Sequence, residues 1–440
     1  MSAPPDGGYG WEMVLAIFWN NAHHWGILSS YGVFMQHFLA HPDYVAGTYL
    51  DYALIGGLAA SQSCLIAPLA TTVHHRYGIK LAVGAGVLLE FAALLGASWS
   101  SQIWHLYLSQ GVCFGWGLGL QYSSSTAIIP QWFTRRRSLA AGITTAGTGT
   151  GGLIYSLAAN AMMDRWGPGW TYRVMAIVQI VVSSCCVLIL RDHERTQNGN
   201  GNGNGNGNGA RESKSIDFRV GRRYEVWLFL GWSFFSVMGF MVIWFSLSTF
   251  SRSIGLTAEQ GSIVTAVMNV GQIVGRPLVG YYSDAVGRIN IATAATLVSG
   301  VLCLSLWVCS RSYAAILCFA FFGGTLFGTF WTVMAPVSAE VVPLKEVRSC
   351  LTIMWLVCVL PATFGEAIGL ELRTEGDRPY LQTQLFTGFM YIGAALCAAL
   401  LRAWKARRVG KAADDGSDTS AGGDDDGYFR ICNVKLWKRV

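Results

Sequence analysis

Charged residues are nearly absent from most of this 440-residue chain, and this shortage limits what the chain can fold into. The chain has 31 Lys and Arg and 25 Asp and Glu residues, and 24 of these 56 lie in residues 191–222 and 405–440. The other 372 residues carry only 32 charges, whereas soluble domains are about 25% charged. A soluble protein of this size would need more polar residues to cover its surface in water. The sequence argues against a soluble enzyme, a nucleic-acid binder and a disordered protein, and it predicts a multi-pass membrane protein.

Apolar segments of about 20 residues recur along the chain. This is the length that spans a bilayer as a helix. We count six before and six after a polar break. They lie near residues 12–38, 48–73, 81–99, 103–129, 139–163, 170–190, 224–250, 260–282, 290–309, 312–336, 349–370 and 382–403. The sequence therefore predicts an all-α membrane protein with twelve transmembrane helices.

The polar break divides these segments into two groups. It contains six consecutive Asn-Gly pairs at residues 198–209, and such a low-complexity tract cannot bury a core. We expect four regions in the chain. They are a six-helix bundle at residues 1–190, a flexible cytosolic linker at 191–223, a second six-helix bundle at 224–404, and a cytosolic tail at 405–440.

The placement of basic residues predicts the orientation. With a cytosolic N-terminus, 24 of the 31 Lys and Arg residues fall on the cytosolic side, six fall outside, and Arg276 lies within a span. Cytosolic loops of membrane proteins carry such an excess. We therefore expect both termini in the cytosol. The plasma membrane is the expected location, with the vacuole or another internal membrane as the alternative.

The two groups of helices also resemble each other in sequence. Pro68 matches Pro277 and Gly78 matches Gly287 at one offset of 209 residues. Each pair follows the second helix of its group. Two related six-helix repeats joined by a long loop are the arrangement of secondary transporters, whose binding site lies between the repeats.

Residues 275–288 read GRPLVGYYSDAVGR and resemble the loop motif of the major facilitator superfamily. In that family the glycines allow close helix packing, and the Asp and Arg form a cytosolic charge latch. The first half departs from the motif, with His75 at the Asp position and Ile79 at the Arg position, so we expect a weaker latch there. The resemblance implies a cytosolic gating motif made of Gly280, Asp284, Gly287, Arg288, Arg135, Arg136 and Arg137.

Two further motifs narrow the resemblance. Residues 5–11, PDGGYGW, are similar to the first-helix entry motif of the monocarboxylate porter family, and residues 132–142 are similar to its second motif. The likeness is strongest to the fungal branch and covers about residues 5–404. It implies the major facilitator fold and transport of a small organic solute from a site near mid-membrane.

Polar residues inside the predicted spans are costly, so each is a candidate site residue. Asn269, Gln272 and Arg276 share one helical face because they stand at i, i+3 and i+7. Proton-coupled members of the resembled family carry an Asp where Gln272 stands and a Lys where Ser29 stands. The resemblance therefore implies that Arg276 binds an anionic group, while the usual proton machinery is incomplete. The alternative is that Arg276 only extends toward the cytosolic surface.

The first span has a polar stripe of Asn21, Trp25 and Ser29 at helical spacing, and the family alignment directs this stripe to the cavity. His24 is a candidate proton carrier because imidazole titrates near neutrality. Its alternative role is a neutral histidine bonded to a neighbouring helix. Glu90, mid-way along the third span, is a second proton candidate or half of a structural pair, and we favour the pair.

These observations predict a secondary active transporter of a small organic solute, either a monocarboxylate-like acid or an exported secondary metabolite. The absence of the family's Lys and Asp favours a larger or less acidic solute. The alternatives are a non-transporting nutrient sensor on the same scaffold and a membrane-embedded enzyme, although no clustered catalytic set is present. We expect no cofactor and no metal. The eleven cysteines include no CxxC pair, and the run at residues 424–426 is typical of a solvated acidic tail. The expected partners are the solute and the lipid bilayer, without nucleic acid.

Overall fold

The computed structural model describes residues 6–41, 44–192, 217–374, 376 and 378–414, and this part of the chain forms helices and no strand. The Asn-Gly tract and the acidic run at residues 424–426 lie outside the described residues. The structure is therefore all-α over the region in which the sequence predicts helices.

The first half of the chain forms a series of helices that begins with α1. These are α1 (Tyr9–Ala40), α2 (Tyr49–Leu65), α3 (Ala67–Tyr77), α4 (Ile79–Ser98), α5 (Ile103–Leu106), the π-helix η1 (Tyr107–Cys113), α6 (Phe114–Thr126), α7 (Ile129–Trp132) and α8 (Arg137–Ile189). Helix α8 breaks at Gly167, whose φ of 74° lies in the left-handed region that glycine adopts without a steric cost. The predicted spans 139–163 and 170–190 are the two arms of α8.

The second half repeats this pattern after the short 3₁₀ helix η3 (Phe218–Arg222). Its elements are α10 (Tyr224–Ser253), α11 (Ala258–Val286), α12 (Arg288–Leu302), the π-helix η4 (Cys303–Trp307), α13 (Tyr313–Phe327), α14 (Thr329–Val341), the 3₁₀ helix η5 (Leu344–Glu346), α15 (Val347–Glu371) and α16 (Leu381–Asp414). Helix α16 continues beyond residue 404, where the apolar pattern ends, because the following residues are mostly Ala, Lys and Arg, which favour helix.

Eight of these helices are long and apolar enough to cross a bilayer, and the bent pair α2–α3 makes a ninth if it counts as one span. Helix α1 is not among the eight, and Asn20, Asn21, His23 and His24 lower the hydropathy of its middle. The segment at 103–129, which contains the π-helix η1, is not among them either. The chain is a multi-pass membrane protein, and the number twelve stays a prediction.

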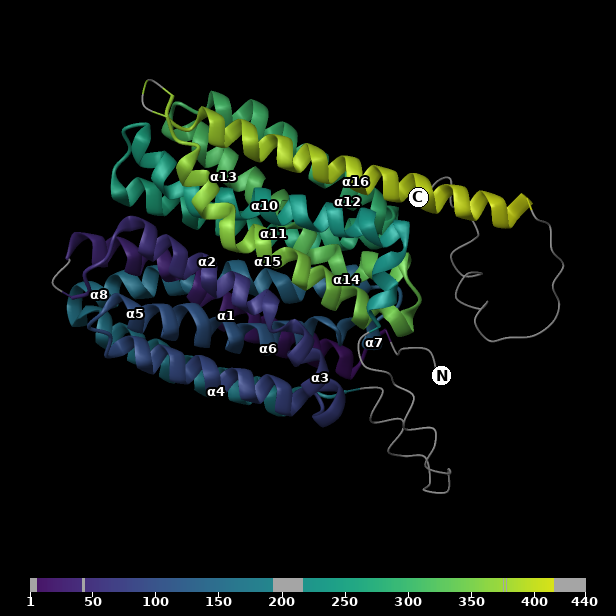
Figure 1. Ribbon diagram of the computed structural model, residues 1–440, viewed down its shortest axis with the longest axis horizontal. Coiled ribbons are helices and arrows are strands. Elements are labelled where there is room, and N and C mark those ends of the chain that lie inside the picture. The colour runs from purple at the N-terminus through teal and green to yellow at the C-terminus, as the bar shows by residue number, and fades with distance from the viewer. Residues whose placement is uncertain (1–5, 42–43, 193–216, 375, 377, 415–440) are drawn as a thin grey trace.

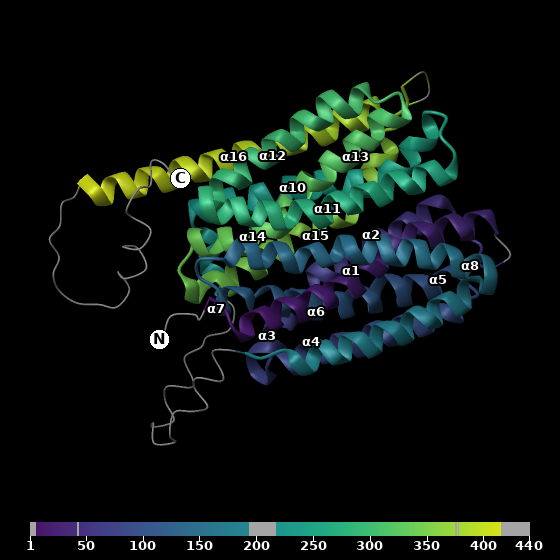
Figure 2. The same cartoon turned by 180° about the vertical axis from the view of Figure 1, so that it is seen from behind.

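The helices form two groups that lie side by side, one from each half of the chain (Figures 1 and 2). Helix α8 packs along α11, and α2 packs along α15, so these two pairs make most of the contact between the halves. Both pairs join helices far apart in the sequence. A site between α1, α8, α11 and α14 therefore has walls from both halves.

Within the first half, α1 lies against α8 at backbone distance. A Cβ atom on Gly151 would stand 1.7 Å from the carbonyl oxygen of Ala22, and one on Gly26 would stand 2.6 Å from the Cα of Gly151. Small residues allow this approach between membrane helices. The contact holds the polar stripe of α1 in a fixed position against the first arm of α8.

Candidate functional site

Arg276 lies on α11 at the interface between the two halves and is only 3% exposed. Its Nη1 donates to the carbonyl oxygen of Thr145 at 2.6 Å and to the hydroxyl of Thr148, both on α8. Its Nη2 donates to Oε1 of Gln272 at 2.6 Å. All three partners are neutral, so within the described residues no carboxylate balances the guanidinium charge.

The three polar residues of α11 form one hydrogen-bonded row. Nε2 of Gln272 donates to Oδ1 of Asn269 at 3.3 Å, while Oε1 of Gln272 accepts from Arg276. This row borders a small cavity between the two halves. The cavity is lined by Trp25, Ser29, Tyr122, Thr148, Phe240, Trp244, Asn269, Gln272, Arg276 and Trp331.

The cavity has more hydrogen-bond donors than acceptors. Four buried N–H groups of its lining have no hydrogen-bond partner among the described residues. They belong to Trp25 (Nε1), Asn269 (Nδ2), Arg276 (Nε) and Trp331 (Nε1). The amide oxygens of the row are already occupied by the row itself, and Thr148 donates its hydroxyl to the carbonyl of Thr145 at 2.9 Å. Buried polar groups are nearly always paired, so this cavity is suited to a group rich in acceptor atoms.

The structure brings five of the six predicted binding residues to this one cavity and places the sixth beside it. Trp25, Ser29, Asn269, Gln272 and Arg276 line the cavity. Asn21 lines a small neighbouring cavity, where its Nδ2 donates to the carbonyl of Thr144 at 2.8 Å. Tyr122 and Trp331 border both cavities.

The two proton candidates line neither of these cavities. His24 is fully buried, and its ring centre lies 6.0 Å from that of Tyr122. Both of its ring nitrogens lack a hydrogen-bond partner among the described residues. Glu90 on α4 is also fully buried and accepts a hydrogen bond from Gln179, on the second arm of α8, at 2.9 Å. The expectation that Glu90 is half of a structural pair agrees with this contact.

Sequence reasoning missed the aromatic wall of the cavity. Half of the lining residues carry aromatic rings, and four of these five were not predicted: Tyr122, Phe240, Trp244 and Trp331. Their spacing gave no signal, because they come from three helices, α6, α10 and α14, that are separated in the sequence.

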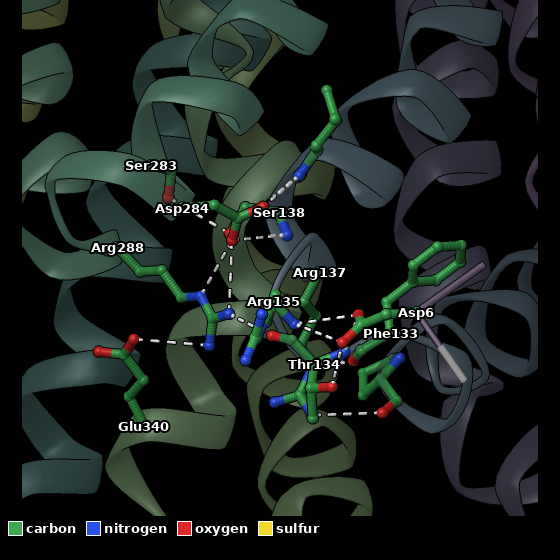
Figure 3. A network of polar contacts seen from close by, with 12 residues as sticks. Asp6, Phe133, Thr134, Arg135, Arg137, Ser138, Ser283, Asp284, Arg288 and Glu340 are labelled. Carbon is green, nitrogen blue, oxygen red and sulfur yellow. Dashed lines mark hydrogen bonds and ion pairs between the residues drawn. The ribbon is translucent and has the colours of Figure 1, made fainter. Parts of the chain in front are cut away.

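A latch at one end of the protein joins α11 to the start of α8 (Figure 3). The carboxylate of Asp284 accepts hydrogen bonds from the backbone N–H groups of Ser138 at 3.1 Å and Leu139 at 2.9 Å. These are free N–H groups at a helix N-terminus, where negative charge is favourable. A Cβ on Gly280 would stand 2.3 Å from the carbonyl oxygen of Ser138, so only glycine permits the close approach. Gly287, with φ of 118°, ends α11.

Arg288 extends the latch in two directions. Its Nη2 donates to the carbonyl of Thr134 at 3.1 Å, across the interface between the halves. Its Nη1 lies 3.5 Å from Oε1 of Glu340, and its Nη2 lies 3.4 Å from Oδ1 of Asp284. Glu340 also pairs with Lys405 of α16. The latch is therefore a network that includes α11, α12, α14, α16 and the loop before α8.

A sequence profile of the Major Facilitator Superfamily matches residues 13–364 and 229–409. The first match alone spans most of the chain. The chain belongs to the major facilitator superfamily. Membership in the superfamily confirms the predicted major facilitator fold, while the narrower assignment to the monocarboxylate porter family stays a prediction.

Relatives of this superfamily protein carry transporter names. Probable transporter MCH2 of Saccharomyces cerevisiae is 35% identical over 90% of this chain and 83% of its own length. The uncharacterized transporter ESBP6 of the same yeast is 29% identical over 92% of this chain, which spans 61% of ESBP6. The fujikurins efflux protein of Gibberella fujikuroi is 25% identical over 93% of this chain and 86% of its own length. The chain is a transporter of the superfamily rather than an enzyme.

The three arginines that the superfamily resemblance placed in the gating motif have different surroundings. Arg137 is 1% exposed, and it donates to the carbonyls of Phe133 at 2.9 Å and Pro130 at 3.2 Å. Arg135 and Arg136 are exposed. Arg137 therefore stabilises the loop before α8 through hydrogen bonds to nearby backbone carbonyls.

The first-half copy of the superfamily motif differs from the second-half copy at the positions of Asp284 and Arg288. Ile79 is buried, and His75 is exposed. The neighbouring His74 instead lies 3.1 Å from Asp192, at the end of α8, and Thr71 bonds to Thr352 of α15 at 3.1 Å between their hydroxyls. A hydroxyl pair therefore joins the halves on this side.

Asp6 ties the two predicted family motifs together before α8 begins (Figure 3). Its carboxylate accepts from the backbone N–H of Thr134 at 2.7 Å, from the Thr134 hydroxyl at 2.6 Å and from the N–H of Arg135 at 3.0 Å. Burial raises the pKa of Asp6, but the bonds from Thr134 and the backbone N–H groups outweigh it, so the pKa lies below its ordinary value of 3.8. The stabilising effect is therefore complete above about pH 4 and is lost as the pH falls through the lowered pKa.

Replacing Asp6 with alanine is expected to free the amides of Thr134 and Arg135 at neutral pH, where the native carboxylate is charged. Hydrogen–deuterium exchange of the peptide containing these residues should become several-fold faster. Asp217→Ala is a matched control, because Asp217 caps Arg219 in another loop. Unchanged exchange in Asp6→Ala would contradict the assignment of Asp6 as the anchor of this loop.

Proposed function

We propose that the protein is a secondary active transporter that moves a small organic anion by alternating access, with Arg276 as the anion-binding residue. The observation that carries this proposal is the excess of unpaired donors around a buried guanidinium between the two halves. Asn269, Gln272, Trp25 and Ser29 shape the cavity around the solute, and Asn21 lies at its margin.

The alternative role of Arg276, extension toward the cytosolic surface, has less support. An extended arginine would bring its charge to water, whereas Arg276 is buried and donates to α8 of the opposite half. A buried charge without an opposite charge is costly. A carboxylate of the solute would offset that cost and would accept the free Nε–H at the same time.

Alternating access requires that the halves separate at one end and then at the other. Polar contacts join the halves at both ends of the structure. The latch of Asp284 and Arg288 closes one end, and at the opposite end Nη2 of Arg252 donates to Oε1 of Gln36 at 2.9 Å. The excess of basic residues supports a cytosolic location for the latch end, and with it both termini. We place the protein in the plasma membrane, with an internal membrane as the alternative.

A variant of His24 tests whether transport is coupled to protons. If His24 carries the proton, His24→Gln should abolish the dependence of transport on an imposed pH gradient, because the amide cannot titrate. Transport should be measured in proteoliposomes at several external pH values. Glu90→Gln is the parallel variant, and the Glu90–Gln179 contact leads us to expect that it keeps the gradient dependence. Retention of the wild-type pH profile in His24→Gln would exclude His24 as the carrier.

Direct flux measurement tests the transporter proposal itself. Purified protein in proteoliposomes should move labelled lactate or benzoate faster than protein-free vesicles, with and without a pH gradient. A nutrient sensor on the same scaffold would bind such an acid without moving it. Export of a secondary metabolite is the second candidate, favoured by the efflux name of the Gibberella fujikuroi relative, and inverted vesicles would detect it.

A further inference from the structure

We propose that the transported solute is a planar aromatic acid whose carboxylate lies at Arg276 and whose ring lies between the aromatic side chains of the cavity. This inference rests on the proposed function, since it names the class of anion that the same cavity takes. It is carried by the aromatic wall and by the distribution of unpaired N–H groups.

The cavity has two chemically different sides. Arg276, Gln272 and Asn269 form the polar side, together with Thr148 and Ser29. The other side consists of aromatic rings only. An acid that fills both sides must therefore join a carboxylate to an apolar body, and a short aliphatic acid would leave the aromatic side uncovered.

The rings come from both halves of the protein and now touch one another. The ring centre of Trp25 lies 5.3 Å from that of Tyr122 in the first half. It also lies 5.7 Å from Trp331 and 6.1 Å from Trp244 in the second half. Aromatic rings favour edge-to-face and offset contacts at these separations. A flat ring placed between Trp25 and Trp331 would replace ring contacts with similar ones, which a non-planar body cannot do.

The charge of the cavity decides between an aromatic acid and a cation. Aromatic walls also attract cations such as quaternary ammonium groups. Arg276 lines this cavity, however, and within the described residues no carboxylate is paired with it. A cationic solute would be repelled, whereas an acid gains both the guanidinium and the rings.

The aromatic side also offers unpaired donors. Nε1 of Trp25 and Nε1 of Trp331 lack hydrogen-bond partners among the described residues. An oxygen substituent on the ring of the solute, such as a hydroxyl or keto group, would accept from them. We therefore expect an oxygenated aromatic acid to bind better than an unsubstituted one.

The test compares acids of similar size that differ in planarity, and includes lactate as a smaller aliphatic acid. Proteoliposomes containing the full chain are given labelled benzoate, 4-hydroxybenzoate, cyclohexanecarboxylate or lactate at pH 7.5, and protein-free liposomes give the background. We expect benzoate uptake to exceed cyclohexanecarboxylate uptake about fivefold, a typical difference for an aromatic contact. We expect 4-hydroxybenzoate to exceed benzoate.

Three variants locate the preference in the structure. Trp331→Leu should abolish the preference for benzoate over cyclohexanecarboxylate, and Trp331→Phe should retain it because the ring remains. Trp227→Leu is the matched control, since Trp227 is 63% exposed on the outer side of α10. Circular dichroism and gel filtration in detergent should show that all three variants are folded.

Each result bears on a separate claim. Equal uptake of benzoate, cyclohexanecarboxylate and lactate, still dependent on Arg276, would overturn the aromatic inference and leave the proposed function in place. Loss of the preference in Trp227→Leu, or its retention in Trp331→Leu, would also overturn it. If folded protein moves none of the acids in either direction, the anion transporter proposal fails together with this inference.

Discussion

Transport by the Arg276→Gln variant is expected to fall by about 30-fold or more, while the protein still folds and reaches the membrane. Removing one partner of a buried, hydrogen-bonded charge pair costs about 2–5 kcal/mol, and 1.4 kcal/mol corresponds to a factor of ten. Glutamine can still bond to the Thr145 carbonyl, so the contact between α11 and α8 is partly retained. The loss therefore measures the charge rather than the packing.

Two further variants separate charge from geometry at this position. Arg276→Lys keeps the positive charge but loses the planar fork of donors, so we expect transport between the wild-type and glutamine values. Arg311→Gln removes an arginine that is exposed, so it should leave uptake unchanged. The measurement is initial uptake of whichever labelled acid the wild-type protein moves. Wild-type rates in folded Arg276→Gln would contradict the role of Arg276 in binding the anion.

The second large effect is expected at the latch, in Asp284→Asn. The native carboxylate accepts two backbone N–H groups of α8, and each such bond to a charged group contributes about 1.5–3 kcal/mol. An amide offers a single acceptor oxygen without charge, so the closed state at this end loses stability. We expect transport to fall about tenfold, because the state closed at this end becomes less populated relative to the state open at this end.

Hydrogen exchange gives a direct measure of the same change. The amides of Ser138 and Leu139 should exchange at least several-fold faster in Asp284→Asn than in the native protein. Glu340→Gln is the matched control, because Glu340 contacts Arg288 and Lys405 but does not reach the start of α8. Native exchange rates at these two amides in Asp284→Asn would show that the carboxylate does not hold the latch closed.

Local spacing was sufficient to predict the polar row of the cavity. Asn269, Gln272 and Arg276 stand at i, i+3 and i+7, and helical geometry alone places them on one face. The structure joins them by hydrogen bonds. The break of α8 was also readable, because a Gly-Pro pair at residues 167–168 interrupts the apolar pattern. The role of Asn269, Gln272 and Arg276 in binding remains a proposal.

Contacts between distant helices could not be predicted in the same way. Trp25 and Trp331 are more than 300 residues apart, and the chain has 17 Trp, 17 Tyr and 22 Phe residues, so no pattern distinguishes those that line a cavity. Membrane helices that are apolar all round also lack the one-sided pattern that marks a buried face in soluble proteins. The partner of Glu90, Gln179, is 89 positions away. The bend between α2 and α3 was not predicted, although Pro68 in the first turn of α3 marks it.

Glu340 marks the division between latch contacts within the second half and latch contacts between the two halves. It holds Arg288 of α12 and Lys405 of α16 at once, and all three residues belong to the second half of the chain. These bonds therefore persist when the halves part, and they brace the second half as one rigid body. The bonds that break include those of Asp284 and Arg288 to the loop and first turn of α8, together with the hydroxyl contact between Thr71 and Thr352. At the latch itself, the plane of separation therefore runs through the backbone groups of residues 134–139.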